Sequence, residues 1–122
     1  MFSLPEEYNN LEALSAPPNY GEPALTIKVN STALDYYLTC GACPEQYDVF
    51  IGATQVGYVR LRWGGLSATY PDYMGSPVYG ASVGDEWAGC FDSNQERDFY
   101  LEKISQVLYN CYQQGGKALS VN

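Results

Sequence analysis

The stretch from residue 56 to residue 63 reads Val56-Gly57-Tyr58-Val59-Arg60-Leu61-Arg62-Trp63, and Gly64-Gly65 follows it directly. Apolar and polar side chains alternate along it, which indicates a β-strand with one buried and one exposed face. The side chains predicted to face the core are Val59, Leu61 and Trp63. Those predicted to face the other way are Tyr58, Arg60 and Arg62. The two glycines favour a tight turn into the next strand.

The same alternation recurs on both sides of this strand. Further strands are predicted over 24–30, 34–39, 46–51, 66–70, 78–83 and 86–91. Most of the links between them are short and rich in Asn, Ser, Gly and Thr. Such spacing predicts an antiparallel β-meander of six to seven strands.

A C-terminal amphipathic helix is predicted to pack across this sheet. Ser93-Asn94-Gln95-Glu96 has the spacing of a capping box, in which the serine and the glutamate satisfy free backbone N–H groups. One apolar stripe then follows, made of Tyr100, Leu101, Ile104, Val107, Leu108, Cys111 and Tyr112. Gly115-Gly116 is expected to end the helix. The predicted fold class is therefore α+β.

The first 23 residues are predicted to form an acidic leader, and residues 24–122 a single domain. Ser3 to Glu6 has the spacing of another capping box, so a short helix over about 4–14 is one interpretation. A partly disordered leader is the other, because so short a helix is marginal on its own. Residues 16–23 contain three prolines and are expected to form an extended linker.

Composition excludes several classes of function. The chain has 122 residues, a net charge of −8 and no histidine. The charge argues against direct binding of nucleic acid or an anionic membrane, because phosphate groups require Lys and Arg. Without histidine the commonest general base and metal ligand are missing. Asp85-Glu86 or Glu45 with Asp48 could form paired carboxylates, but acids at strand ends are usually solvated. We expect no enzyme and no cofactor.

The sequence near residue 1 has no basic region followed by a continuous apolar segment, and no run is long enough to span a membrane. We therefore expect a cytoplasmic protein with its four cysteines reduced. Cys40-Gly41-Ala42-Cys43 has the spacing of a zinc knuckle or a redox pair. The remaining zinc ligands would have to come from Cys90, Cys111 or carboxylates. Because a second such pair is missing, no metal site is predicted.

The two arginines of the central strand form the first candidate site. Arg60 and Arg62 should lie on one face about 7 Å apart, beside Tyr58. Like charges at that spacing repel unless something anionic lies between them. Three interpretations stay open: neutralisation by Asp48, Asp35 or a helix carboxylate, simple solvation, or a binding site for an anionic ligand. In the last, the guanidinium groups would hold a carboxylate or phosphate while Tyr58 stacks on a ring.

The acidic helix forms the second candidate site. Its carboxylates are Asp92, Glu96, Asp98 and Glu102. One interpretation is a solvated helix face. The other is a surface that mimics nucleic acid and blocks a basic groove on a partner protein.

Residues 47–52, 55–64 and 70–71 resemble small uncharacterised accessory proteins of bacteriophages and prophages. The motifs are Tyr47-Asp48-Val49-Phe50-Ile51-Gly52, then Gln55 through Gly64, then Tyr70-Pro71. The resemblance covers only these three segments and contains no ligand or catalytic motif. It implies a setting only: such proteins often inhibit host defence by stoichiometric binding, in the host cell cytoplasm.

Three functions follow as hypotheses. The first is a non-enzymatic inhibitor of bacterial defence that sequesters a small anionic, nucleotide-like ligand at Tyr58, Arg60 and Arg62. The second is an acidic inhibitor that occupies a basic groove of a nucleic-acid-binding enzyme. The third is a virion or assembly component. Sheet edges and abundant tyrosine also make a homo-oligomer a reasonable expectation.

Overall fold

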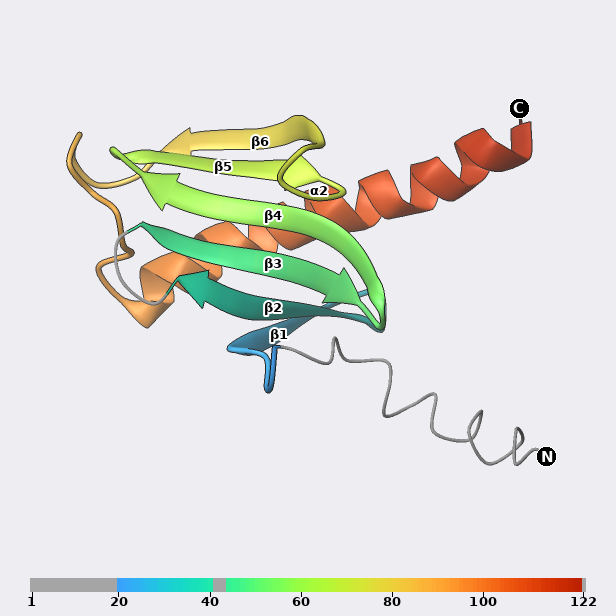
Figure 1. Cartoon of the computed structure of the whole chain (residues 1–122), viewed down its shortest axis with the longest axis horizontal. Helices are drawn as coiled ribbons and strands as arrows, with labels where there is room; N and C mark the ends of the chain where they lie inside the picture. Colours follow the sequence, from blue (N-terminus) through green and yellow to red (C-terminus); the bar gives the residue numbers. More distant parts are fainter. Residues whose placement is uncertain (1–19, 41–43, 122) are drawn as a thin grey trace.

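A computed structural model describes residues 20–40 and 44–121, with side chains described as far as residue 115. Six strands form one sheet in the order of the chain, and each pairs antiparallel with the next. They are β1 (Leu25–Val29), β2 (Thr32–Cys40), β3 (Glu45–Ile51), β4 (Thr54–Arg62), β5 (Gly65–Tyr70) and β6 (Ser76–Ser82), followed by the helix α2 (Asn94–Val121) (Figure 1). The predicted α+β meander with a C-terminal helix is confirmed. The predicted leader helix lies outside the described residues.

Two-residue turns set the register of three hairpins. Asn30 and Ser31 both have positive φ, as do Trp63 and Gly64, which is the backbone of a type I′ turn. Gly52 has a φ of 61° between β3 and β4. Turns of this kind match the twist of the strands that they join, so each strand returns directly beside its predecessor.

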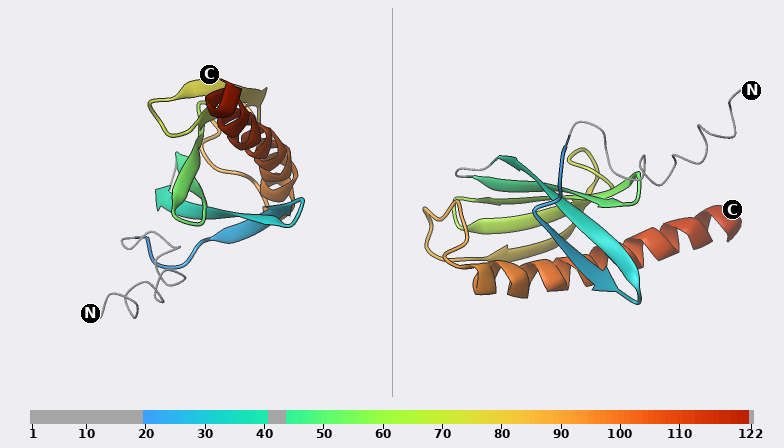
Figure 2. Two further views of the ribbon diagram at one scale, coloured as in Figure 1. Left: turned by 90° about the vertical axis from the view of Figure 1, so that its right-hand side faces the viewer. Right: turned by 90° about the horizontal axis from the view of Figure 1, so that it is seen from below.

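The sheet curves, and α2 lies across its concave side, in contact with both edge strands β1 and β6 (Figure 2). The fully buried helix residues Leu101, Ile104 and Leu108 pack against the concave face. Gly57 on β4 allows the close approach of Leu108, because a Cβ at that position would overlap the leucine side chain. The sheet residues of this core are Val29, Leu34, Tyr36, Tyr47, Val49, Val56, Val59, Leu61, Leu66 and Ala68, and Val83 joins them from the loop after β6.

A buried polar contact fixes the helix over β2. The hydroxyl of Tyr36 lies 2.6 Å from Oγ of Ser105 and donates to the carbonyl of Leu101 at 3.2 Å. Both side chains are completely buried, and burial raises the pKa of Tyr36. Because a buried hydroxyl without a partner is costly, this pair favours one position of α2 along the sheet.

The helix begins with the predicted capping box. The backbone N–H of Glu96 donates to Oγ of Ser93 at 3.0 Å, and the Glu96 carboxylate accepts the N–H of Asp92 at 2.8 Å. The return bond therefore reaches Asp92, one residue before the cap. Two N–H groups at the start of the helix gain partners in this way.

Ser93→Ala is expected to lower the free energy of unfolding by about 1 kcal/mol, because one helix N–H loses its acceptor. Ser93→Asp retains an acceptor and should stay close to the unmodified protein. Urea denaturation followed by circular dichroism compares the two variants. An equal loss in both would contradict a capping role for Ser93.

Three local predictions are wrong. Residues 86–91 form a loop, because Asp85 turns the chain: its side chain accepts the N–H of Trp87 at 2.9 Å and its carbonyl that of Ala88 at 3.1 Å. Trp63, predicted to be core, is 60% exposed because the two-residue turn begins at that position.

The helix does not end at Gly115 but continues to Val121 and projects beyond the sheet (Figure 1). Gly115 does not adopt the positive φ that would terminate it.

Candidate functional site

Tyr58, Arg60 and Arg62 lie on the face of the sheet opposite α2, as predicted from their spacing. The register places Tyr58 between Asp48 and Thr69, and Arg60 between Gln46 and Ser67. Tyr58 also makes an edge-to-face contact with Tyr73, with ring centroids 6.1 Å apart. We call this side of the sheet the outer face.

The acids expected to neutralise the arginines bond elsewhere. Asp48 accepts a hydrogen bond from the hydroxyl of Tyr20, and Asp35 accepts one from Thr26 at 2.6 Å. Within residues 20–40 and 44–115, neither Arg60 nor Arg62 forms an ion pair; the ion pair in this part joins Arg97 to Asp98 at 3.0 Å. The guanidinium groups of the outer face therefore have unused donors that could hold an anion.

Tyr20, which falls in the predicted linker, covers the part of the outer face formed by β2 and β3. Its ring packs edge-to-face on Tyr37 at 5.1 Å and on Phe50 at 5.5 Å. Tyr37 and Phe50 are buried although they lie on the outer face. The hydrogen bond to Asp48, together with burial, raises the pKa of Tyr20 to about 12. Tyr20 therefore packs on the β2–β3 part of the outer face, whereas Tyr73 contacts Tyr58 on the β4 part.

Tyr20→Phe is expected to reduce the amount of stability that the chain loses as the pH rises above 10. A phenol with a folded-state pKa of about 12 against 10.0 in the unfolded chain contributes stability that is complete below pH 10 and is lost as the pH rises towards 12. Urea midpoints measured from neutral pH to pH 12 should fall less steeply for Tyr20→Phe than for the unmodified chain. Identical slopes would show that Tyr20 does not carry this linkage.

A second feature lies beside Arg62, where two exposed tryptophans, Trp63 and Trp87, are in contact. The guanidinium carbon of Arg62 lies 5.5 Å from the ring centroid of Trp63, and the rings of Trp63 and Trp87 meet at 68° with centroids 5.8 Å apart. Trp87 is 70% exposed. A hollow of about 360 Å³ lies here, lined by Pro44, Arg62, Trp63, Trp87 and Gly89. We call it the tryptophan hollow.

The loop from Val83 to Asp92 that carries Trp87 is fastened to the sheet by its backbone. Gly64 N–H donates to the carbonyl of Ala88 at 2.7 Å, and Glu45 N–H to that of Gly89 at 2.7 Å. The Glu45 carboxylate also accepts the N–H of Phe91 at 3.0 Å. These bonds hold the loop against both the β4–β5 turn and the start of β3, so the two indole rings have a defined arrangement.

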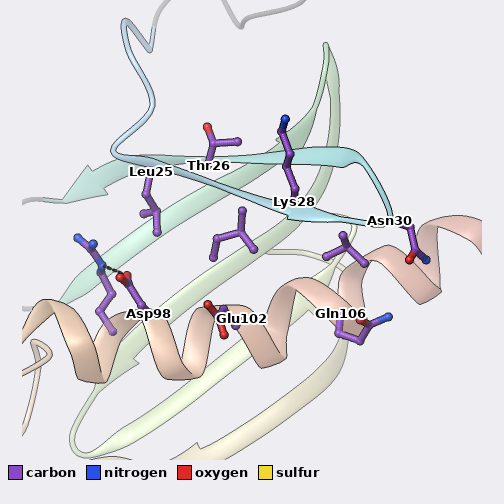
Figure 3. A pocket seen from close by; sticks show the side chains of 10 residues that line it. Leu25, Thr26, Lys28, Asn30, Asp98, Glu102 and Gln106 are labelled. Carbon is purple, nitrogen blue, oxygen red and sulfur yellow. Dashed lines mark hydrogen bonds and ion pairs between the residues drawn. The ribbon is translucent and has the colours of Figure 1, made fainter.

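The four carboxylates proposed for partner binding fall into two groups. Asp92 and Glu96 belong to the N-terminal cap of α2. Asp98 and Glu102 line a groove of about 640 Å³ between α2 and β1 (Figure 3). Along the groove, Leu25 points towards α2, whereas Thr26 and Lys28 point away from it (Figure 3). The acidic helix therefore does not present all four charges to one partner surface.

One of the described cysteines, Cys90, differs from expectation. Cys90 is disulfide-bonded, so the prediction that all four thiols are reduced is wrong for this residue. Cys111 lies partly buried in the apolar stripe of α2, and burial raises the pKa of its thiol. Among the described residues no group of three or more His, Cys, Asp or Glu side chains could hold a metal ion. Cys43 lies outside these residues, and the absence of a metal site stays a prediction.

The tryptophan hollow was missed by sequence reasoning, which assigned Trp63 to the core and Trp87 to a strand. The signals that could have found it are the Trp63-Gly64 pair, which suits a two-residue hairpin turn, and Asp85, which favours a side-chain-capped turn. Over the described chain, no helix is long and apolar enough to cross a membrane. Comparisons with protein-family models, curated proteins and solved structures found no match.

Proposed function

We propose that this chain is a non-enzymatic binding protein that sequesters a small anionic, nucleotide-like ligand at Tyr58, Arg60 and Arg62. The observation that carries the proposal is the pair of arginines on the outer face of β4, which has no ion-pair partner in the described part of the chain. Guanidinium groups bind carboxylates and phosphates through paired hydrogen bonds. In a chain of net charge −8, a basic patch of this kind is the natural place for an anion.

The biological setting in this proposal is a bacteriophage inhibitor of bacterial defence that acts in the host cytoplasm. Its support is the resemblance of residues 47–52, 55–64 and 70–71 to phage and prophage accessory proteins. A protein that removes a signalling nucleotide by stoichiometric capture needs a binding face but no catalytic group. A homo-oligomer fits the same proposal, because the edge strands β1 and β6 could pair with other copies.

Thermal denaturation in the presence of AMP, GMP, UMP or ADP tests this proposal. A bound nucleotide should raise the melting temperature of the chain, because a ligand that binds only the folded state stabilises it. Arg60→Ala/Arg62→Ala should abolish that increase. The matched control is Lys28→Ala/Lys103→Ala, which also removes two positive charges, but from exposed positions elsewhere on the chain. No increase in the unmodified chain, or an increase that survives the arginine substitutions, would refute the proposal.

The groove between α2 and β1 favours a second candidate function, inhibition of a protein with a basic groove. Asp98 and Glu102 line the α2 side of this groove, and Leu25, Ile27 and Val29 line the β1 side. The strand β1 lies at the edge of the sheet. An extended basic segment could pair with the strand edge and place a charge on Glu102, since Asp98 is already paired with Arg97. Binding of polylysine should then weaken with salt and with Glu102→Lys, but not with Glu86→Lys, which makes the same charge change elsewhere. Equal effects of both substitutions would exclude the groove.

The third hypothesis, a virion or assembly component, stays a prediction. Stable co-purification of the chain with structural proteins of a phage particle would support it. None of the contacts described above favours it over ligand capture.

A further inference from the structure

The exposure of two neighbouring tryptophans is the feature that the proposed function leaves unexplained. Trp63 and Trp87 are 60% and 70% exposed, although burying an indole ring is strongly favourable. They come from different segments, the β4–β5 turn and the loop after Val83, and they meet in the folded chain. Exposed aromatic side chains that gather at one point mark an interaction site.

The backbone holds the two tryptophans in place before any ligand arrives. The bonds from Gly64 to Ala88 and from Val83 to Gly64, at 2.7 and 2.9 Å, join the turn to the loop directly. A ligand that enters such a preformed site does not have to order the loop, so little of the binding free energy is lost.

The chemistry of the hollow indicates one kind of ligand. Indole faces stack on flat rings, Arg62 supplies a positive charge, and a volume of about 360 Å³ lies at the lower end of small-molecule sites. Beyond Trp63, Asp85 and Glu86 line an adjacent hollow of about 280 Å³. The charge therefore changes sign across Trp63, and an anionic group would be attracted to the Arg62 side and repelled from the other.

We infer that the tryptophan hollow recognises the base of the ligand, while Arg62 and Arg60 hold its phosphate. The ligand class is then a nucleotide with an aromatic base and a single compact anionic group. This inference rests on the proposed function and narrows the class of ligand. Any anion could bind the two arginines, but only a flat ring can stack on Trp63 and Trp87. Arg62 belongs to both parts, because it faces the hollow and lies on the outer face beside Arg60.

Calorimetric titration with AMP, ribose 5-phosphate and adenosine tests the inference. Ribose 5-phosphate retains the anion without the base, and adenosine retains the base without the anion. AMP should bind at least about tenfold more tightly than either, because each of them lacks one of the two groups that the site is expected to hold. Trp87→Ala should weaken AMP binding by about tenfold and leave ribose 5-phosphate unchanged. The matched control, Phe99→Ala, removes an exposed ring from α2 and should change neither.

The outcomes separate this inference from the proposed function. Equal affinities for AMP and ribose 5-phosphate, both lost in Arg60→Ala/Arg62→Ala and unaffected by Trp87→Ala, would overturn base recognition and leave anion capture standing. Equal affinities for AMP and adenosine that depend on Trp87 would overturn the role of the arginines. No binding of any of the three would count against both proposals.

Discussion

Ile104→Ala is expected to lower the free energy of unfolding by about 2–5 kcal/mol, the usual cost of removing a large aliphatic side chain from a packed core. Ile104 is completely buried between α2 and the concave face of the sheet. A domain of this size has a total stability of about 5–15 kcal/mol, so the loss is a large part of it. Urea denaturation followed by circular dichroism measures the change.

Gln113→Ala is the control for this substitution, because Gln113 lies exposed on the same helix. Its effect should stay within about 0.5 kcal/mol. A loss below about 1 kcal/mol for Ile104→Ala would mean that the helix packs loosely on the sheet, since a close-packed site cannot lose three carbon atoms so cheaply.

Gly64→Ala should destabilise the chain and open the tryptophan hollow. Gly64 has a φ of 72°, which costs a residue with a Cβ about 1–2 kcal/mol, and the added Cβ would overlap the carbonyl oxygen of Asp85. The loop from Val83 to Asp92 must then move away from the turn. Trp87 loses its contact with Trp63, and the tryptophan fluorescence of the folded chain should change together with the urea midpoint.

Gly65→Ala is the matched control, one residue further along the same turn. Gly65 has no positive φ, and the nearest atom to an added Cβ there is the carbonyl oxygen of Arg62 at 3.4 Å. Its effects on fluorescence and on stability should be smaller. Equal effects of both substitutions would contradict the contact between Gly64 and the loop.

Local patterns predicted the elements of this fold because each strand pairs with its neighbour in the chain. Alternation along residues 56–63 placed Arg60 and Arg62 on one face without knowledge of the other strands. Ser93 and Glu96 located the start of α2 for the same reason, since a cap involves only nearby residues. Gly115 gave a wrong prediction of the helix end. Glycine can adopt helical φ and ψ at a moderate cost, so a helix can continue through it.

The tryptophan hollow could not be predicted in this way, because it depends on contacts between distant segments. Trp63 is exposed because it follows the last residue of β4 and is the first residue of the turn. Trp87 is positioned by hydrogen bonds that join its loop to Gly64 and Glu45, about 20 and 40 residues earlier in the chain. Nothing in the sequence near Trp87 indicates that its ring meets another tryptophan.

The order of elements has a consequence for synthesis of the chain on the ribosome. All six strands precede α2, and each can pair as soon as it emerges, but the concave face stays uncovered until residues 94–112 have left the exit tunnel. During that interval the nascent chain exposes the apolar side chains that chaperones bind. The helix that covers the concave face is therefore made after all six strands, and the sheet stays prone to aggregation until α2 packs on it.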